Sequence, residues 1–200
     1  TYSVSASTLQ VGGAVGINRA GGTVSKVKVT SAFEKFTKYT YLGGVVGQNN
    51  ASGKVTECTY SGTIDEGKSA VGNCYGGIAG LNRGTISECV FTGCEMNSLN
   101  LPPEDPNEIK TEEYHISAAT GGISGVNYGA IENCTVLFSE CGSAFYLGLV
   151  SGVNIKGRGV IKDSRGLKFG RWSDDGDSEY IAECANTVKA GTYSKFVKGL

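Results

Sequence analysis

The sequence predicts an all-β fold, a parallel β-helix or β-solenoid of about five coils, which we expect to be right-handed. Three observations lead to this class. One pattern returns five times along the chain, Gly accounts for 31 of the 200 residues while Pro accounts for only 3, and the repeats lack the apolar spacing of an amphipathic helix. A recurring period in a Gly-rich chain indicates stacked coils rather than a domain with one central core.

The pattern is clearest over residues 76–89, which read Gly-Gly-Ile-Ala-Gly-Leu-Asn-Arg-Gly-Thr-Ile-Ser-Glu-Cys. Its copies begin at residues 12, 43, 76, 121 and 148, so they lie 31, 33, 45 and 27 residues apart. This length suits one coil of two or three short strands joined by corners. Leucine-rich repeats, propeller blades and helical repeats fit the pattern less well.

An Asn begins the turn in every copy, and the turn ends in a Gly. The Asn side chain can bond the backbone two residues on, and Asn residues in a stack can bond one another, so we expect a structural ladder. We also expect the closing Gly to supply a positive φ. The ladder residues are Asn18, Asn49, Asn82, Asn127 and Asn154, and the closing residues are Gly22, Gly53, Gly84, Gly129 and Gly159.

After the turn, apolar residues stand two and five positions past the closing Gly. Side chains of a strand alternate between its faces, so this spacing predicts a bend at the intervening polar pair, which is Ser87-Glu88 in the third copy. The position five past the Gly holds Cys58, Cys89 and Cys134 in three copies. We expect these residues to form a buried column of small side chains. The alternative is disulfide bonding, with Cys74 paired to Cys94 or to Cys141.

We interpret residues 1–200 as a single solenoid domain. Residues 1–11 are a partial first coil, residues 12–165 are the five repeats, and residues 166–200 are final strands or a cap. An insertion at 95–117 holds all three Pro residues and the only His, His115. Because Pro disrupts strand pairing, we expect a loop over 95–115 with a helical turn near 108–114.

Charge and hydropathy exclude several classes of partner. Eighteen Lys and Arg against nineteen Asp and Glu give a net charge of −1, and no basic run occurs. This composition argues against nucleic acid and against other polyanions. The longest apolar window, 144–153, is too short to span a membrane.

The Gly-Gly-Ile-x-Gly-x-Asn and Gly-x-Ile-x-x-Cys halves of the pattern resemble the GLUG repeat of bacterial surface and secreted proteins. That family includes adhesin-like proteins and the stalk regions of immunoglobulin A peptidases, and the resemblance covers residues 11–165. It implies an extracellular setting at the bacterial cell surface, within a longer chain whose other domains are partners. It also implies attachment or display toward host proteins or glycans, and it supplies no catalytic residue.

The sequence itself predicts no catalytic residue and no cofactor. A single His excludes a His-Glu-x-x-His zinc site, and His115 has no nucleophile motif beside it. Carboxylates near the end of the chain could bind Ca²⁺, although a solvated acidic turn is the simpler interpretation; they are Asp175, Asp177 and Glu179. The alternative to a scaffold is a carbohydrate-active β-helix, because such enzymes group charged residues on one face. Its ligand-binding residues would be Lys168, Arg171, Trp172 and Asp175.

Overall fold

The computed structural model is built from short parallel strands. It describes residues 9–34, 40–67, 73–92, 95–98, 119–137, 140–141, 146–155, 157–166, 170–172 and 178–180. All strand pairs within these ranges are parallel except the last, between β25 and β26. The same ranges contain no helix that could cross a membrane.

The strands form five sheets. The first stacks β1 (Leu9–Gly12), β6 (Thr40–Gly43), β11 (Cys74–Gly76), β16 (Ala119–Gly121) and β21 (Tyr146–Gly148). The second stacks β2 (Val15–Asn18), β7 (Val46–Asn49), β12 (Ala79–Asn82), β17 (Ser124–Asn127) and β22 (Ser151–Asn154). The third stacks β3 (Thr23–Ser25), β8 (Lys54–Thr56), β13 (Thr85–Ser87), β18 (Ala130–Glu132) and β23 (Val160–Lys162). The fourth stacks β4 (Lys28–Thr30), β9 (Thr59–Ser61), β14 (Val90–Phe91), β19 (Thr135–Val136) and β24 (Arg165–Gly166). The fifth stacks β5 (Phe33–Glu34), β10 (Thr63–Gly67), β15 (Glu95–Ser98), β20 (Glu140–Cys141), β25 (Gly170–Trp172) and β26 (Ser178–Tyr180).

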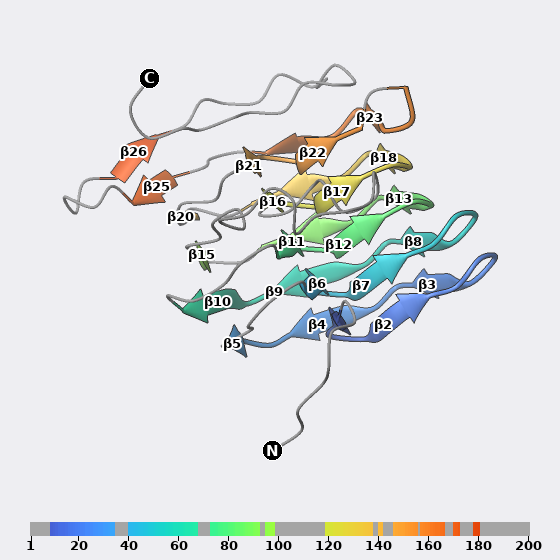
Figure 1. Cartoon of the computed structure of the whole chain (residues 1–200), viewed down its shortest axis with the longest axis horizontal. Helices are drawn as coiled ribbons and strands as arrows, with labels where there is room; N and C mark the ends of the chain where they lie inside the picture. The colour runs from blue at the N-terminus through green and yellow to red at the C-terminus, as the bar shows by residue number, and fades with distance from the viewer. Residues whose placement is uncertain are drawn as a thin grey trace, which may run out of the picture.

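Successive strands along the chain enter the five sheets in turn, and the chain then returns to the first sheet one level higher (Figure 1). This arrangement confirms the predicted all-β parallel solenoid. The predicted content of one coil was wrong, because each coil contributes five short strands instead of two or three. The strands are short because several tight corners interrupt each coil.

The predicted bend follows each strand of the third sheet, at one residue whose φ lies in the left-handed region. This residue stands four positions past the closing Gly in every copy, and none of the five is Gly. The residues are Lys26, Glu57, Glu88, Asn133 and Asp163, with φ between 48° and 58°. Such a backbone costs an L-residue roughly 1–2 kcal/mol. The first four corners also bond the next coil, as when the Glu88 amide donates to the Glu132 carbonyl at 3.0 Å.

The predicted role of the closing Gly was wrong. The positive φ values in these turns belong to earlier residues, which are Gly21, Ser52 and Gly157. The closing Gly is needed for space, because a Cβ at Gly53 would lie 2.5 Å from Oδ1 of Asn49. The Asn side chain of the same turn fills this space at Gly22, Gly53 and Gly159, whereas at Gly84 and Gly129 the carbonyl of the closing Gly in the preceding coil fills it.

The core fills the inside of the stack from coil to coil. The rings of Tyr60 and Phe91 stack on successive levels, with centroids 5.6 Å apart and an interplanar angle of 8°. A Cβ at Gly44 or Gly77 would collide with these same rings. The Gly-Gly doublets therefore let the backbone pass directly against the aromatic column.

The predicted insertion needed correction at its start. The predicted loop over 95–115 begins with a strand, because β15 pairs with β10 and β20. Beyond residue 165, where we expected final strands or a cap, β25 pairs with β20 of the preceding coil. The described residues do not include residues 1–8, the remainder of the insertion or residues 181–200. The helical turn predicted near 108–114 and His115 lie in the part of the insertion that is not described.

Candidate functional site

The five Asn residues form a continuous hydrogen-bonded ladder. The side-chain amide of each residue donates to the side-chain oxygen of the next at 2.8 Å, from Asn18 through Asn49, Asn82 and Asn127 to Asn154. All five residues are buried, with at most 5% of their surface exposed. Their hydrogen bonds stay inside the stack, so the ladder is a structural device and no ligand can reach it.

Each Asn also holds its own turn together. Within its own turn, Oδ1 of Asn82 accepts from the Gly84 amide at 3.2 Å, while its amide also donates to the Ala130 carbonyl of the next coil at 3.1 Å. Asn127 accepts in the same way from Gly129 at 3.1 Å. The Asn side chain thus supplies hydrogen-bond partners to backbone groups that a tight turn would otherwise leave unpaired.

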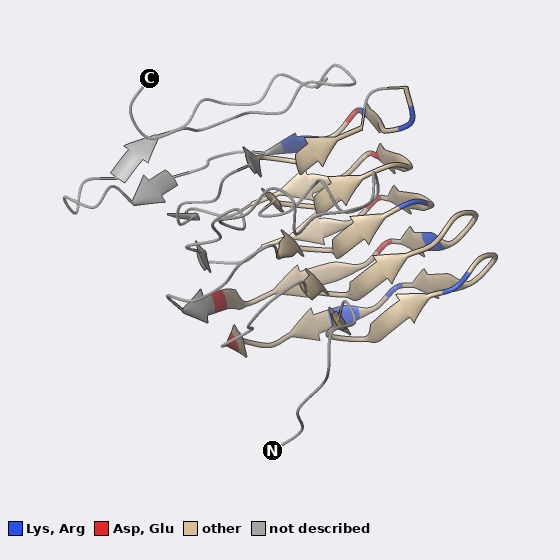
Figure 2. Cartoon of the chain, in the orientation of Figure 1, with Lys and Arg blue, Asp and Glu red and all other residues tan. Residues whose placement is uncertain are grey.

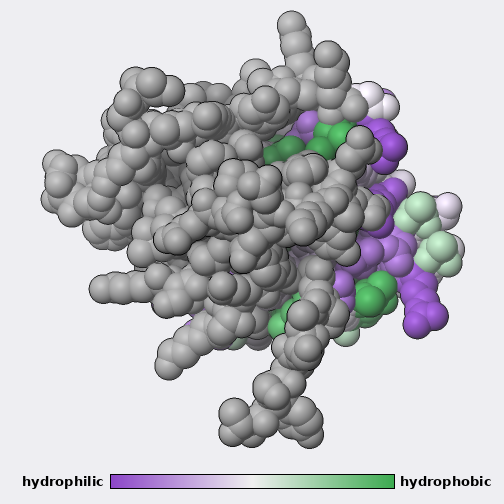
Figure 3. Space-filling model, in the orientation of Figure 1, coloured by the Kyte–Doolittle hydropathy of each residue, from purple (hydrophilic) through white to green (hydrophobic). Residues whose placement is uncertain are grey.

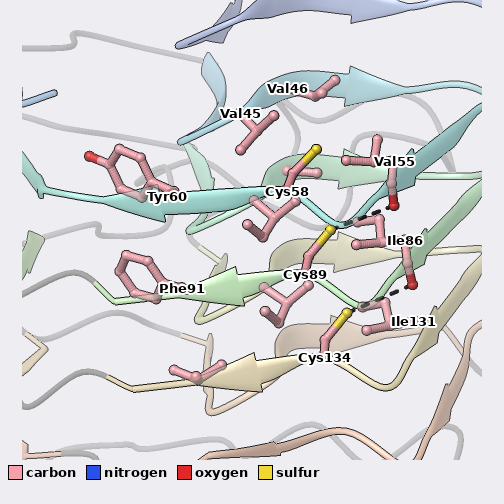
Figure 4. Close-up of a cluster of buried hydrophobic side chains, with 14 of the residues drawn as sticks. Val45, Val46, Val55, Cys58, Tyr60, Ile86, Cys89, Phe91, Ile131 and Cys134 are labelled. Atoms are coloured by element: carbon pink, nitrogen blue, oxygen red, sulfur yellow. Dashed lines mark hydrogen bonds between the residues drawn. The ribbon is translucent and has the colours of Figure 1, made fainter. Parts of the chain in front are cut away.

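The column of Cys58, Cys89 and Cys134 is fully buried and its thiols are free (Figure 4). Each thiol donates to the carbonyl two residues before it, at 3.2 to 3.3 Å. The dashed lines in Figure 4 join Cys89 to the Val55 carbonyl and Cys134 to the Ile86 carbonyl, each in the preceding coil. Ser164 occupies the same position and bonds the Lys162 carbonyl at 3.0 Å. Four of the five copies therefore place a small donor beside the corner carbonyl, while the first copy holds Val27, which packs against the core without a donor.

The thiols do not form a reactive centre. A thiol contact with Cys89, together with burial, raises the pKa of Cys58 far above its ordinary value. The pKa of Cys89 rises to about 12, first because of its contact with Cys134, whose own pKa is lowered by accepting from Cys89. All three sulfur atoms are closed off from solvent, so they offer no accessible nucleophile.

Cys74 is also buried, and desolvation raises its pKa to about 12. It forms no disulfide bond in this structure, which disagrees with the disulfide alternative. The side chains of Cys94 and Cys141 lie outside the described residues.

Charged side chains lie on the outside of the stack, and no described one is buried. Two groups lie on either side of the third sheet (Figure 2). The group at the turns, which we name the basic ridge, consists of Arg19, Lys54, Arg83 and Arg158. The group at the corner, which we name the acidic corner, consists of Glu57, Glu88, Glu132 and Asp163. The sequence alone missed this separation, because the members of each group lie far apart along the chain.

The speculative site residues at the end of the chain are only partly placed. Arg171 and Trp172 belong to β25, where Arg171 pairs with Glu179 of β26 through the backbone, but their side chains are not among the described ones. Lys168, Asp175 and Asp177 lie outside the described residues. Within the described ranges no cluster of His, Cys, Asp or Glu could hold a metal ion. The calcium and sugar-binding hypotheses therefore stay predictions.

Comparisons with known proteins give no relative. No family model, no curated protein and no solved structure matches the chain.

Proposed function

We propose that this chain is a non-catalytic structural and adhesive segment of a larger extracellular bacterial protein, which displays or binds glycans or host proteins. The observation that carries the proposal is the use of the interior. Apolar columns and the Asn ladder fill it from the first coil to the last, and the charged groups of the described residues face outward. Such a stack is a rigid spacer whose outer faces are available to partners.

The resemblance to GLUG repeats supports the setting of this proposal. Its carriers are the Gly-Gly doublets, the ladder Asn and the Cys position, each of which has a structural role within the stack. Residues with such roles explain why the pattern recurs without requiring any chemistry.

The test combines binding with turnover. The purified chain is screened on a glycan array and a panel of host matrix proteins, and the same polysaccharides are assayed for released reducing ends or unsaturated sugars. We expect binding without turnover. If the screen finds no bound glycan or host protein and a polysaccharide is cleaved, the proposal is refuted and the carbohydrate-active alternative is favoured. No described side chain supports that alternative.

A further inference from the structure

The basic ridge is a group of cations that the linear sequence does not contain, so the net charge of −1 and the lack of a basic run do not exclude a polyanion at this surface. Arg19 and Arg83 occupy the same repeat position, and backbone hydrogen bonds stack these turns. Asn50 donates to the Asn18 carbonyl at 2.9 Å, and Arg83 donates to the Asn49 carbonyl at 2.8 Å. With strands about 4.8 Å apart, the two arginines stand about 10 Å apart along the stack.

Two further cations extend this line. Lys54 donates its amide to the Gly22 carbonyl at 2.8 Å, which places it on the level between the two arginines. Arg158 lies in the last turn, where its amide donates to the Ile155 carbonyl at 3.1 Å. The ridge thus follows the direction in which the coils stack, at the edge where the turns lie (Figures 1 and 2).

Three cations of the ridge are not neutralised by the described part of the chain. Arg19, Lys54 and Arg158 are exposed, and none of them forms an ion pair with a described residue. The cations near the corner differ, because Lys26 lies 3.7 Å from Glu57 and Lys162 lies 4.0 Å from Asp163.

Arg83 is held in place along the ridge. Its guanidinium lies over the ring of Tyr128 on the next level, 5.6 Å from the ring centroid. A cation over an aromatic face is oriented while it keeps its charge.

Hydroxyl groups border the ridge on the third sheet. Thr23 and Thr85 begin their strands directly after the turns, and Thr56 donates to Ser25 at 3.1 Å across two exposed positions. In the space-filling view, hydrophilic residues stand beside weakly hydrophobic ones along this same edge (Figure 3). Cations next to hydroxyls can bind both the acid groups and the hydroxyl groups of a sugar acid.

We propose that the basic ridge binds a linear anionic polysaccharide, one that carries carboxylate or sulfate groups, with the polymer lying along the stack. This inference rests on the proposed adhesive function and assigns it a surface and a ligand class. Charge complementarity supplies the attraction, and cations on the first, second, third and fifth levels match a polymer that carries repeated acid groups.

The surroundings of the ridge favour a sugar polymer over nucleic acid. The acidic corner lies only one three-residue strand away, about 10 Å, so a double helix on the ridge would also face like charge. Single-stranded nucleic acid is bound on rows of aromatic side chains. Among the described turn residues Tyr128 is the single aromatic one, and Arg83 already lies over it.

The test compares two triple variants of equal charge. The ridge variant carries Arg19→Ser, Lys54→Ser and Arg158→Ser. The control variant carries Lys28→Ser, Lys162→Ser and Arg165→Ser, which are exposed cations on the other side of the third sheet or at the corner. Each variant loses three positive charges, so the net charge changes from −1 to −4 in both.

Binding is measured by fluorescence anisotropy with four labelled probes: heparin, polygalacturonate, neutral dextran and a single-stranded DNA oligomer. We expect the wild-type chain to bind at least one of the two acidic polysaccharides, more weakly as salt rises, and not to bind dextran. The ridge variant should lose about tenfold or more in affinity, since three exposed charge contacts are removed, while the control changes by less than about twofold. Circular dichroism verifies that both variants fold.

Three results would overturn the inference: no binding of either acidic polysaccharide, an equal loss in both variants, or DNA binding as tight as that of the sugar polymer. The proposed function fails separately. If the ridge variant still binds another glycan or a host protein as the wild type does, the adhesive function stands and the ridge is not its surface.

Discussion

Replacing an Asn in the middle of the ladder by Ala should destabilise the fold more than replacing an Asn at its end. Asn82 makes four hydrogen bonds of 3.2 Å or shorter, with Asn49, Asn127, Ala130 and Gly84. It is fully buried, so water cannot replace these partners in Asn82→Ala. At about 1 kcal/mol for each bond, we expect the free energy of unfolding to fall by about 4 kcal/mol.

The matched control is Asn154→Ala, at the C-terminal end of the ladder. Asn154 makes two such bonds, one from Asn127 at 2.8 Å and one to the Gly159 carbonyl at 3.2 Å, so its loss should cost about 2 kcal/mol. Urea unfolding followed by far-ultraviolet circular dichroism measures both values. Equal costs for the two variants, or a cost below about 1 kcal/mol for Asn82→Ala, would refute the reasoning that the ladder bonds stabilise the stack.

Three further changes test other parts of the structure. Glu88→Gly should raise the free energy of unfolding by about 0.5–1 kcal/mol, because φ is 55° at this exposed corner and Gly adopts that backbone without strain. Thr120→Val should raise it by about 1 kcal/mol, because the Thr120 hydroxyl is buried without a hydrogen-bond partner. Stability should fall as pH rises from 9 towards 12, because the unfolded chain releases the Cys74 proton near pH 9 while the folded chain retains it to about pH 12. Between these two pKa values the Cys74 thiol lowers the free energy of unfolding by about 1.4 kcal/mol for each pH unit. Below pH 9 its stabilisation is fully present.

Each of these changes has its own control. Glu132→Gly removes a charge from a strand residue of ordinary backbone and should destabilise, whereas stabilisation by both Gly variants would point to charge rather than φ. Thr85→Val, on a half-buried surface, should change little. Cys74→Ala should flatten the alkaline decline by the contribution of one proton, and an unchanged slope would show that Cys74 does not cause it. Urea titrations at each pH supply all of these values.

The repeat register could be predicted from the sequence because stacked coils place equal positions above one another. The Asn position did not vary between copies, and each residue bonds its counterpart on the next level, as at Asn49 and Asn82. The Cys position was equally visible, since Cys58, Cys89 and Cys134 recur five residues past the closing Gly. A residue that must match its own copy leaves a periodic signal.

Other features left no such signal. The turn Gly was assigned to backbone conformation, but the space it leaves is occupied by an Asn side chain, as at Gly53 and Asn49. The corner residue varies between acid, base and amide, so its left-handed backbone was not evident from residue type. The strand count per coil was underestimated because strands such as Val90–Phe91 are too short to show an alternation.

The sequence by itself determined the class of fold, the register of the coils and the columns that hold them together, because these depend on positions that repeat. Only the tertiary structure decided which outward-facing residues become neighbours. Arg19, Lys54, Arg83 and Arg158 lie far apart in a chain with a net charge of −1 and no basic run. Stacking brings them to one edge, where coils about 4.8 Å apart place cations on four of the five levels.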